Sequence, residues 1–432
     1  MKKTTFVVSI VLILTLVFAP FSALAYTPTF EVGGENALLI NPDTQDVLYS
    51  SGADERISPA STVFLMVALV VCDNVADMTQ SFEVDTTPRT TLSGTGALVS
   101  DIRKDEQLTY DQLMHFLLIS SYNDVALFLA EKVAGDTETF VELMNERAKS
   151  LGMKDTQFTT PIGLTREDQY TTVNDLYKLA KVVFENDYLV GVMNRSRYSV
   201  PATNKSGSRI LSNTNYMVDS YTSYYYKYMV AGKTGNGDEG RCLVSMATKD
   251  STNFICIVAR CDSSTRNEFK DTKNLYEWAF NNFRYKTVVT KGEMLPVSVP
   301  VELSWDRDSL TLAAGQTVIA LLPKDADLST VEYRAELVGE TVDAPIKNGD
   351  ILGTVDIVFA DEVIGVVELV ATENIEGSFV LGVWRFLSRI IGNIFVQIAL
   401  IMLALGFVAL TIVANVKAKR ERDKKLRLKK RL

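Results

Sequence analysis

The sequence predicts an α+β protein: an antiparallel sheet packed against a helical cluster, then a small β-rich domain and a C-terminal transmembrane helix. Strand-like apolar runs stand at both ends of residues 26–286, and segments with helical periodicity lie between them. Short β-rich runs separated by Gly and Asp fill residues 288–371. Residues 394–414 hold no charged side chain, and as a helix they would be about 30 Å long, enough to cross a bilayer.

The first 25 residues have the pattern of a secretory signal peptide. Lys2 and Lys3 precede an apolar run at residues 6–18, and the segment ends on A-L-A at residues 23–25, a small-x-small cleavage site. A retained N-terminal anchor has a similar apolar run, but the cleavage site favours removal of the segment. We therefore expect an exported protein.

The first elements of residues 26–286 are predicted from local pattern. "NALLINPDTQDVLYS", from residue 36, has two apolar runs around a polar turn and predicts a β-hairpin. "TYDQLMHFLLISSYNDVALFLAEKVAG", from residue 109, predicts two helical runs separated at the polar stretch "SSYND". "TETFVELMNERAKSLGM", from residue 137, predicts an amphipathic helix that Thr137 or Thr139 caps.

The end of this part predicts three strands and a closing helix. "YMVAGKTGNGDEGRCLVSMATKDSTNFICIVARC", from residue 228, has three apolar runs and two turns, and "NEFKDTKNLYEWAFNNF" follows it with helical periodicity. The tyrosine-rich "YMVDSYTSYYYKYM", from residue 216, could stack on sugar rings. Strand surface is the favoured interpretation, because tyrosine is enriched in strands. The single histidine, His115, is interpreted as a helix-surface or core residue.

The C-terminal segments predict attachment to a membrane. "FVLGVWRFLSRIIGNIF", from residue 379, sets Trp384, Arg385 and Arg389 among apolar residues, as in a helix at a membrane interface. The tail at residues 417–432 carries ten Lys and Arg and two acids, a net charge of +8. Basic residues beside a span stay on the cytoplasmic side, so the rest of the chain would lie outside. A buried core helix is the alternative for the apolar run, but core helices seldom end in a polybasic tail.

Charge and cysteine usage exclude several classes of partner. Setting aside the tail and the two signal-peptide lysines changes the total of −9 to −19, so we expect no nucleic-acid partner. The basic tail more plausibly meets anionic lipid headgroups. No C-x-x-C occurs and the chain has one histidine, so no Cys/His metal site is predicted. Pairing cannot be read from spacing, and apolar surroundings favour Cys242 and Cys256 as buried side chains. The four cysteines are Cys72, Cys242, Cys256 and Cys261.

Three short motifs stand in a fixed order in residues 26–286. They are Ser61-Thr62-Val63-Phe64, Ser121-Tyr122-Asn123 and Lys233-Thr234-Gly235. Each motif alone is a weak signal, but the order S-x-x-x, S-x-N, K-T-G within one exported domain is much more specific. A phosphate-binding loop around "GKT" is excluded, because that motif needs a glycine where Lys227 stands.

With these motifs, the chain from about residue 35 to its C-terminal anchor resembles the low-molecular-weight penicillin-binding proteins, which are serine-type D-Ala-D-Ala carboxypeptidases. The resemblance includes "SPAS", "LLISSYNDVALFLAEKVAG", "MNERAKSLGMKDTQFTTPIGL", "TTVNDLYKLA" and "GKTGNGDEGRCLVSMA". "APIKNGDILG" resembles the family's β-rich second domain. In chain order, the predicted parts are residues 1–25 (signal peptide), 26–286 (carboxypeptidase-like domain of the penicillin-binding and β-lactamase fold), 288–371 (β-rich domain), 372–393 (juxtamembrane amphipathic segment), 394–416 (transmembrane helix) and 417–432 (cytoplasmic tail).

The resemblance implies a role for each motif residue. Ser61 would attack the D-Ala-D-Ala bond of a peptidoglycan stem peptide and form an acyl-enzyme, and Ser121 would relay a proton. Asn123 would hold the substrate amide. Lys233 and Thr234 would bind the terminal carboxylate, and Gly235 would let substrate approach the strand closely. β-Lactams are then possible ligands, and no cofactor is implied.

The sequence departs from the family's pattern at the position of the general base. The family's lysine follows the serine by one helical turn, but Phe64 stands there and has no lone pair to accept a proton. Losing a general base typically lowers a rate by about 10²–10⁴-fold, so we expect impaired or lost turnover. Asn236, directly after K-T-G, stands where many members of the family carry a bulky aromatic residue or a histidine.

Several alternatives stay open from the sequence alone. The protein could be an active carboxypeptidase that uses Lys233 as an unusual base, or a non-catalytic scaffold that is tethered to the membrane and binds the wall. Ser61 could be an ordinary residue at the start of a helix, and Phe64 ordinary helix core. Ser121 and Asn123 could cap the helix after the polar break.

Overall fold

The structure is a computed structural model that describes residues 27–429 of the 432 in the chain. The predicted signal peptide, residues 1–25, therefore lies outside the described residues. The chain divides into two compact units. The first is Met1–Lys286 with Leu321–Ala326, and the second is Thr287–Ala320 with Asp327–Leu432.

A five-stranded antiparallel sheet forms the centre of the first unit, in the order β2-β1-β9-β8-β7. The predicted hairpin is present as β1 and β2. Side chains alternate between the two faces of each strand, so Leu38 and Ile40 enter one core cluster while Ala37 and Leu39 enter the other. The strands are β1 (Asn36–Ile40), β2 (Val47–Ser51), β7 (Met229–Gly237), β8 (Gly240–Lys249) and β9 (Thr252–Cys261).

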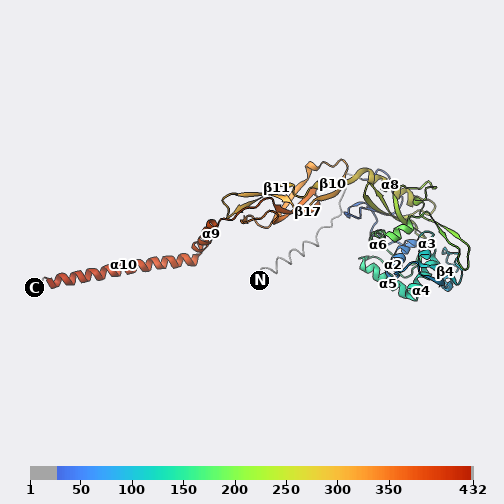
Figure 1. Ribbon diagram of the computed structural model, residues 1–432, viewed down its shortest axis with the longest axis horizontal. Helices are drawn as coiled ribbons and strands as arrows, with labels where there is room; N and C mark the ends of the chain where they lie inside the picture. The colour runs from blue at the N-terminus through green and yellow to red at the C-terminus, as the bar shows by residue number, and fades with distance from the viewer. Residues whose placement is uncertain (1–26, 430–432) are drawn as a thin grey trace. The chain divides into compact units, whose positions relative to one another are not determined.

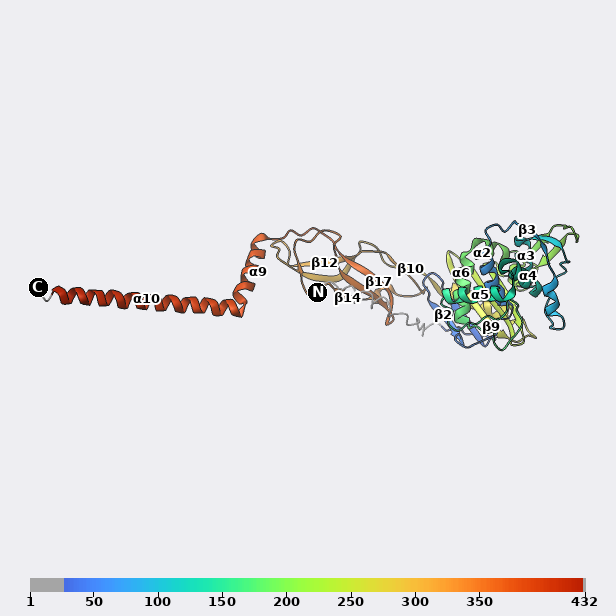
Figure 2. The ribbon, with the colours of Figure 1, turned by 90° about the horizontal axis from the view of Figure 1, so that it is seen from below.

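A cluster of helices covers one face of this sheet (Figures 1 and 2). Its central member is α2, in which every residue from Val63 to Val71 is buried, and which contacts α3, α4, α5 and α6. A helix that is apolar all round is stable only in such an interior position. The helices of this unit are η1 (Ala60–Thr62), α2 (Val63–Asn74), η2 (Thr87–Leu92), α3 (Tyr110–Leu118), α4 (Asn123–Ala134), α5 (Thr137–Ser150), α6 (Val173–Glu185), α7 (Asp187–Met193), η3 (Tyr216–Val218) and α8 (Asn267–Asn282).

The predicted closing helix, α8, packs on β8 and β9 at the opposite face of the sheet, through Leu275, Tyr276 and Ala279. The sheet is thus covered on both faces, and the predicted combination of an antiparallel sheet with a helical cluster is confirmed.

Two local predictions are wrong. Neither Thr137 nor Thr139 caps α5; the side chain of Asp136 does, accepting a hydrogen bond of 2.7 Å from the Thr139 N–H. Aspartate is among the strongest N-cap residues. The tyrosine-rich segment from Tyr216 is not strand surface either. It forms η3 and turns before β7 begins, and its rings pack towards α8, with Tyr226 stacked on Tyr276 at 5.8 Å between ring centroids. Burial against a helix outweighed the strand propensity of tyrosine.

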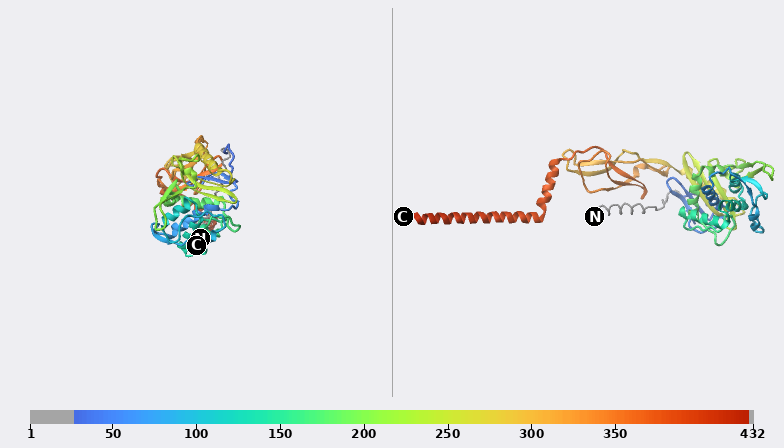
Figure 3. Two further views of the ribbon diagram at one scale, coloured as in Figure 1. Left: turned by 90° about the vertical axis from the view of Figure 1, so that its right-hand side faces the viewer. Right: turned by 60° about the horizontal axis from the view of Figure 1, so that its bottom comes forward.

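The second unit is β-rich, as predicted (Figure 3). Its six-stranded sheet has the order β14-β16-β17-β12-β11-β15, in which β11 and β15 are parallel and the other pairs antiparallel. A separate two-stranded sheet pairs β10 with β13, and residues 283–286 of β10 and 321–323 of β13 belong to the first unit. The elements are β10 (Phe283–Val289), β11 (Met294–Glu302), β12 (Ser309–Ala314), β13 (Val318–Pro323), η4 (Leu328–Thr330), β14 (Glu332–Leu337), β15 (Val342–Asp343), β16 (Ile351–Phe359) and β17 (Glu362–Ala371).

Two helices end the described chain: α9 (Phe379–Gly392) and α10 (Ile394–Lys429). The side chain of Ser378 caps α9, and Arg385 from its polar side pairs with Glu302 and Asp343 of the β-rich sheet. Within residues 27–429, one helix is long and apolar enough to span a membrane, Ile394–Asp423, with a mean hydropathy of 2.6 and none of its apolar window buried. This helix coincides with the predicted transmembrane segment.

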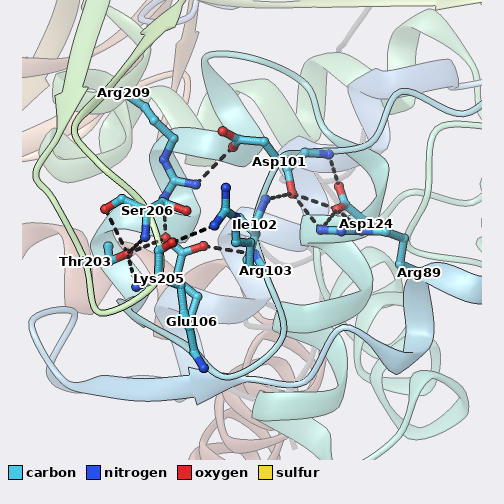
Figure 4. Close-up of polar contacts among 11 residues, drawn as sticks. Arg89, Asp101, Ile102, Arg103, Glu106, Asp124, Thr203, Lys205, Ser206 and Arg209 are labelled. Carbon is cyan, nitrogen blue, oxygen red and sulfur yellow. Dashed lines mark hydrogen bonds and ion pairs between the residues drawn. The ribbon is translucent and has the colours of Figure 1, made fainter.

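A buried carboxylate links two small hairpins of the first unit, β3 (Ser81–Val84) with β4 (Glu106–Thr109), and β5 (Arg197–Val200) with β6 (Arg209–Ser212). The fully buried Glu106 accepts hydrogen bonds from Arg209, from Thr203 and from the backbone N–H of Arg103 (Figure 4). Burial alone would raise the pKa of Glu106, but these hydrogen bonds and the charge of Arg209 outweigh it and lower the pKa.

We predict that Glu106→Gln destabilises the fold by about 3 kcal/mol at neutral pH, because it leaves Arg209 beside an uncharged group in a largely buried position. The folded-state pKa of Glu106 is depressed, so its contribution is present at neutral pH and is lost as pH falls through that pKa. Urea unfolding of the full chain in detergent, followed by tryptophan fluorescence, measures the difference. Glu332→Gln breaks an exposed pair with Arg334 and should cost less than about 1 kcal/mol. Equal losses in both variants would contradict the prediction.

Candidate functional site

Ser61 lies on the single turn of 3₁₀-helix that leads into α2. The residue before it, Ala60, has a φ of +45°, a conformation that non-glycine residues rarely adopt. Ser61 is half-buried and caps neither η1 nor α2, since neither helix has a side-chain cap. Among residues 27–429, no hydrogen bond engages the Ser61 hydroxyl, so it is free to rotate. An uncommitted serine directly after a strained residue, at the start of a buried helix, is more than an ordinary helix residue.

The backbone at Gly163 lies directly against Ser61. A Cβ atom at position 163 would come within 2.7 Å of Ser61 Oγ and Cα, so only glycine fits without displacing the serine. The N–H of Gly163 donates a hydrogen bond of 2.9 Å to Asn123 Oδ1. Gly163 therefore joins the first motif to the second.

Ser121 occupies the break between α3 and α4 and has a φ of +65°. The N-cap of α4 is Tyr122, which makes no side-chain cap, so the interpretation of Ser121 and Asn123 as simple caps is wrong. Instead, Ser121 Oγ accepts a hydrogen bond of 2.8 Å from Lys233 Nζ. Strained backbone that no capping role explains is typical of functional sites.

A loop before β4 fixes the orientation of Asn123. The Leu98 carbonyl accepts hydrogen bonds from the backbone N–H of Asn123 (2.9 Å) and from its side-chain Nδ2 (3.4 Å). The buried carboxylate of Asp124 holds this loop, because it accepts hydrogen bonds from the N–H and hydroxyl of Ser100 and pairs with Arg89 (Figure 4). Both ends of the Asn123 amide are thus engaged.

Lys233 comes from β7, the edge strand of the sheet, and is fully buried. Its Nζ donates hydrogen bonds to Ser121 Oγ (2.8 Å) and to the Thr234 carbonyl (2.7 Å). None of the ion pairs of the described residues involves it. Burial, opposed in part by the neighbouring Cys242, lowers the pKa of Lys233 to about 7. Its charged and neutral forms are therefore both populated near neutral pH.

Phe64 occupies the position one helical turn after Ser61 and is fully buried. The centroid of its ring lies 5.6 Å from Lys233 Nζ, within the range of a cation–π contact. Phe64 is therefore helix core and, at the same time, part of the wall around the lysine. No proton acceptor stands at this position.

The rest of the third motif packs closely. The hydroxyl of Thr234 donates to Thr214 Oγ1 at 2.6 Å. A Cβ atom at Gly235 would lie 2.3 Å from Cys242 Sγ and 3.3 Å from Ala60 Cβ, so the glycine lets β7 pack against the serine's turn. Packing therefore requires a glycine at position 235. The predicted reason, close approach of the substrate to the strand, is a separate one.

The structure thus brings all three predicted motifs together, although Ser61 and Ser121 share no hydrogen bond in this state. Sequence reasoning missed Gly163, Leu98 and Thr214 as site residues. The segment "TTPIGLT" holds Gly163, but nothing in a single sequence shows which residue a glycine touches. His115 was predicted to be a helix-surface or core residue, and of these two alternatives the structure shows the core one, since His115 is buried in α3 and stacked on Tyr198. The four cysteines are free thiols, and Cys242 and Cys256 are buried as predicted.

Comparisons with known proteins give one consistent family. A family model described as D-alanyl-D-alanine carboxypeptidase matches residues 23–263, and one described as the C-terminal domain of penicillin-binding protein 5 matches residues 283–377. The chain is 27% identical to the D-alanyl-D-alanine carboxypeptidase DacF of Bacillus subtilis over 88% of this chain and 96% of that protein. It is 28% identical to DacC of Escherichia coli, over 85% and 92%.

Solved structures share the fold. Penicillin-binding protein 5 from Haemophilus influenzae superposes with a TM-score of 0.63 at 22% identity, over 81% of this chain and 99% of that one. The D-alanyl-D-alanine carboxypeptidase DacD from Francisella tularensis gives a TM-score of 0.65 at 21% identity, over 84% and 99%.

The buried amine predicts a pH-dependent stability. The pKa of Lys233 is lowered in the fold, so between about pH 7 and the usual lysine pKa near 10.5 the unfolded chain binds more protons than the folded chain. Stability should therefore rise with pH in this window, by up to about 1.4 kcal/mol per pH unit from this group. Compared with Lys233→Met, the native chain should gain stability from pH 7 to pH 10 in urea unfolding. Lys249→Met, on β8, is the matched control. A difference that stays constant over this range would mean that Lys233 remains charged in the fold.

Proposed function

The chain belongs to the D-alanyl-D-alanine carboxypeptidase family, and we propose that it binds the D-Ala-D-Ala end of peptidoglycan stem peptides and forms an acyl-enzyme at Ser61 only slowly. The family model covers the whole of the candidate site, and the relatives it resembles are named for this activity. The observation that carries the slow turnover is Phe64, fully buried where the general base is expected.

Binding would use the edge strand. The peptide backbone of the substrate would lie along β7, whose outer edge has no partner strand among the described residues. Thr234 and Thr214 offer hydroxyls for the terminal carboxylate, and Lys233 beneath them offers positive charge when it is protonated. The side-chain oxygen Oδ1 of Asn123 already accepts a hydrogen bond from the N–H of Gly163. The amide of the substrate would have to share or displace that hydrogen bond.

Attack by Ser61 needs a proton acceptor, because a serine hydroxyl is a weak nucleophile at its own pKa. The phenyl ring of Phe64 excludes both an amine and a water molecule from the place one turn along α2. We therefore expect acylation slower by about 10²–10⁴-fold than in a variant with the lysine restored. β-Lactams would act as slow covalent ligands of the same serine.

The location we propose is the outer face of a bacterial cytoplasmic membrane. The apolar helix α10 supports anchoring, and the basic tail after it supports an orientation with the tail inside. Export would rest on residues 1–25, and wall peptides would then be within reach of the first unit.

Acylation by a fluorescent penicillin tests the function directly. The full chain in detergent is incubated with the reagent, and the adduct is followed by gel fluorescence and located by peptide mass. We expect a slow adduct at Ser61 in the native chain, none in Ser61→Ala, and a rate at least about 10²-fold higher in Phe64→Lys. Ser58→Ala, in the same segment, is the matched control and should react like the native chain.

The result of Phe64→Lys separates the alternatives. A native chain that reacts as fast as Phe64→Lys would contradict the loss of the base and identify an ordinary active enzyme. If neither chain reacts with penicillin nor binds a D-Ala-D-Ala peptide, the site is not a peptide site, and the membrane-tethered scaffold is the remaining alternative.

Removal of the last helix tests membrane attachment. A chain that ends at residue 393 should leave the membrane fraction on alkaline carbonate washing, because only the apolar helix beginning at Ile394 is long enough, within residues 27–429, to span the bilayer. The full chain should stay in the pellet. Retention of both chains after the wash would contradict α10 as the anchor.

A further inference from the structure

The buried amine of Lys233 has contacts that fit a proton acceptor better than a simple carboxylate clamp. It is fully buried, faces the ring of Phe64 and makes no ion pair with a described carboxylate. Building on the function proposed above, we propose that Lys233, acting through Ser121, is the general base for the slow acylation at Ser61. The lysine of the third motif would thus have taken over the task of the missing lysine of the first.

The hydrogen bonds of Lys233 suit a neutral amine. A neutral amine has two N–H groups and one lone pair. One N–H donates to the Thr234 carbonyl, which can only accept. In the neutral form, the lone pair would instead face Ser121 Oγ across the same 2.8 Å and accept the proton of that hydroxyl. The Ser121 oxygen is left with its own lone pairs to receive a proton from a second hydroxyl.

Ser61 is placed to supply that proton. Its hydroxyl is uncommitted, and it lies against Gly163, whose N–H is bonded to Asn123, two residues after Ser121. From the other side, Phe64 lies one turn after Ser61 and 5.6 Å from Lys233 Nζ. The two ends of the proposed proton path, Ser61 and Lys233, therefore lie close to the same residues. A rotation of the Ser61 side chain in the substrate complex would close the remaining gap, since catalytic hydrogen bonds often tighten only on binding.

Burial favours the neutral form of the amine. The ring of Phe64 provides no anion to hold a proton on the nitrogen, and although its π face attracts an ammonium group, burial lowers the pKa of Lys233. The carboxylate of the substrate would meet the half-buried Thr234 and Thr214 hydroxyls, because Lys233 itself is not exposed. The general base, Lys233, and the groups that contact the carboxylate, the hydroxyls of Thr234 and Thr214, can then be different side chains.

The step balances in protons and bonds. Ser61 Oγ bonds the carbonyl carbon of the terminal peptide bond while its proton passes to Ser121 Oγ and the proton of Ser121 passes to Lys233 Nζ. The tetrahedral intermediate collapses by breaking the C–N bond. Lys233 returns the proton through Ser121 to the departing D-Ala nitrogen, or to the lactam nitrogen when the ligand is a β-lactam. An ester on Ser61 remains.

The pH dependence of acylation tests the proposal. The full chain in detergent is mixed with saturating fluorescent penicillin between pH 5.5 and 9.5, and the first-order rate of adduct formation is measured. The rate should rise about tenfold per pH unit and then level off, with an apparent pKa at or above about 7, because the bound carboxylate raises it. Non-covalent binding, measured by fluorescence anisotropy with Ser61→Ala, should change little over the rising part.

Substitutions identify the group that titrates. Lys233→Arg keeps the positive charge but cannot lose its proton in this range, so its rate should fall about 10²-fold and lose the rise with pH, while binding stays within a few-fold. Ser121→Ala should fall by a similar factor, and the double variant no further, because the two act as one unit. Phe64→Lys combined with Lys233→Arg should regain the rate. Lys249→Arg is the matched control.

Three results would overturn the proposal. They are a native rate that does not change with pH, a Lys233→Arg variant that keeps the native rate, and a native chain that binds penicillin but forms no adduct at any pH. In the last case, an adduct in Phe64→Lys would mean that the proposed binding function holds and that only the proposed role of Lys233 as the general base is wrong. Absence of both binding and adduct in every variant would instead contradict the proposed function itself.

Discussion

The candidate site depends on one constraint: an amine is buried between an edge strand and the break of two helices with no carboxylate beside it. An uncompensated buried charge is costly, so the fold either surrounds Lys233 with dipoles or leaves it neutral. It does both, since the Thr234 carbonyl and the Ser121 hydroxyl take its hydrogen bonds and the pKa falls to about 7. The turn at Ser121 and the ring of Phe64 both contact this amine.

Backbone that is unfavourable by itself holds this arrangement. Ala60 and Ser121 both have positive φ, and each such residue costs on the order of 1–3 kcal/mol. The surrounding core supplies that free energy, because α2 is buried from Val63 to Val71 and Asp124 holds the loop that carries Leu98. The strain therefore sits on the two turns that present hydroxyl groups, while the strands and helices behind them are regular.

The sequence predicts the parts of this site better than their contacts. Hydrophobic periodicity and turn residues were enough to predict the hairpin, the three long strands and the closing helix. The order of the motifs was enough to predict that Ser61, Ser121 and Lys233 belong to one site. Contacts between distant segments were not predictable, because no local pattern encodes them: Gly163 against Ser61, or the Leu98 carbonyl on Asn123. The tyrosine-rich segment failed for the same reason, since packing towards α8 decided its conformation. The motif residues are where the sequence placed them, and their chemical roles remain proposals.

Phe64 connects the stability of the fold with the proposed lack of a general base in the first motif. A lysine at this position would put a second ammonium group into the core of α2, close to Lys233, and two like charges in a low-dielectric site repel strongly. A phenylalanine there buries an apolar side chain instead, worth about 1.5–3 kcal/mol, and relieves that repulsion. Catalytic groups are often held at the expense of stability, so a core residue in the place of one would stabilise the fold and, in the function proposed above, slow the chemistry. What remains beside Phe64 is a site with two serines, a strand edge and a single amine whose pKa lies near 7, so on that proposal ligand binding would survive and slow chemistry would pass through Lys233.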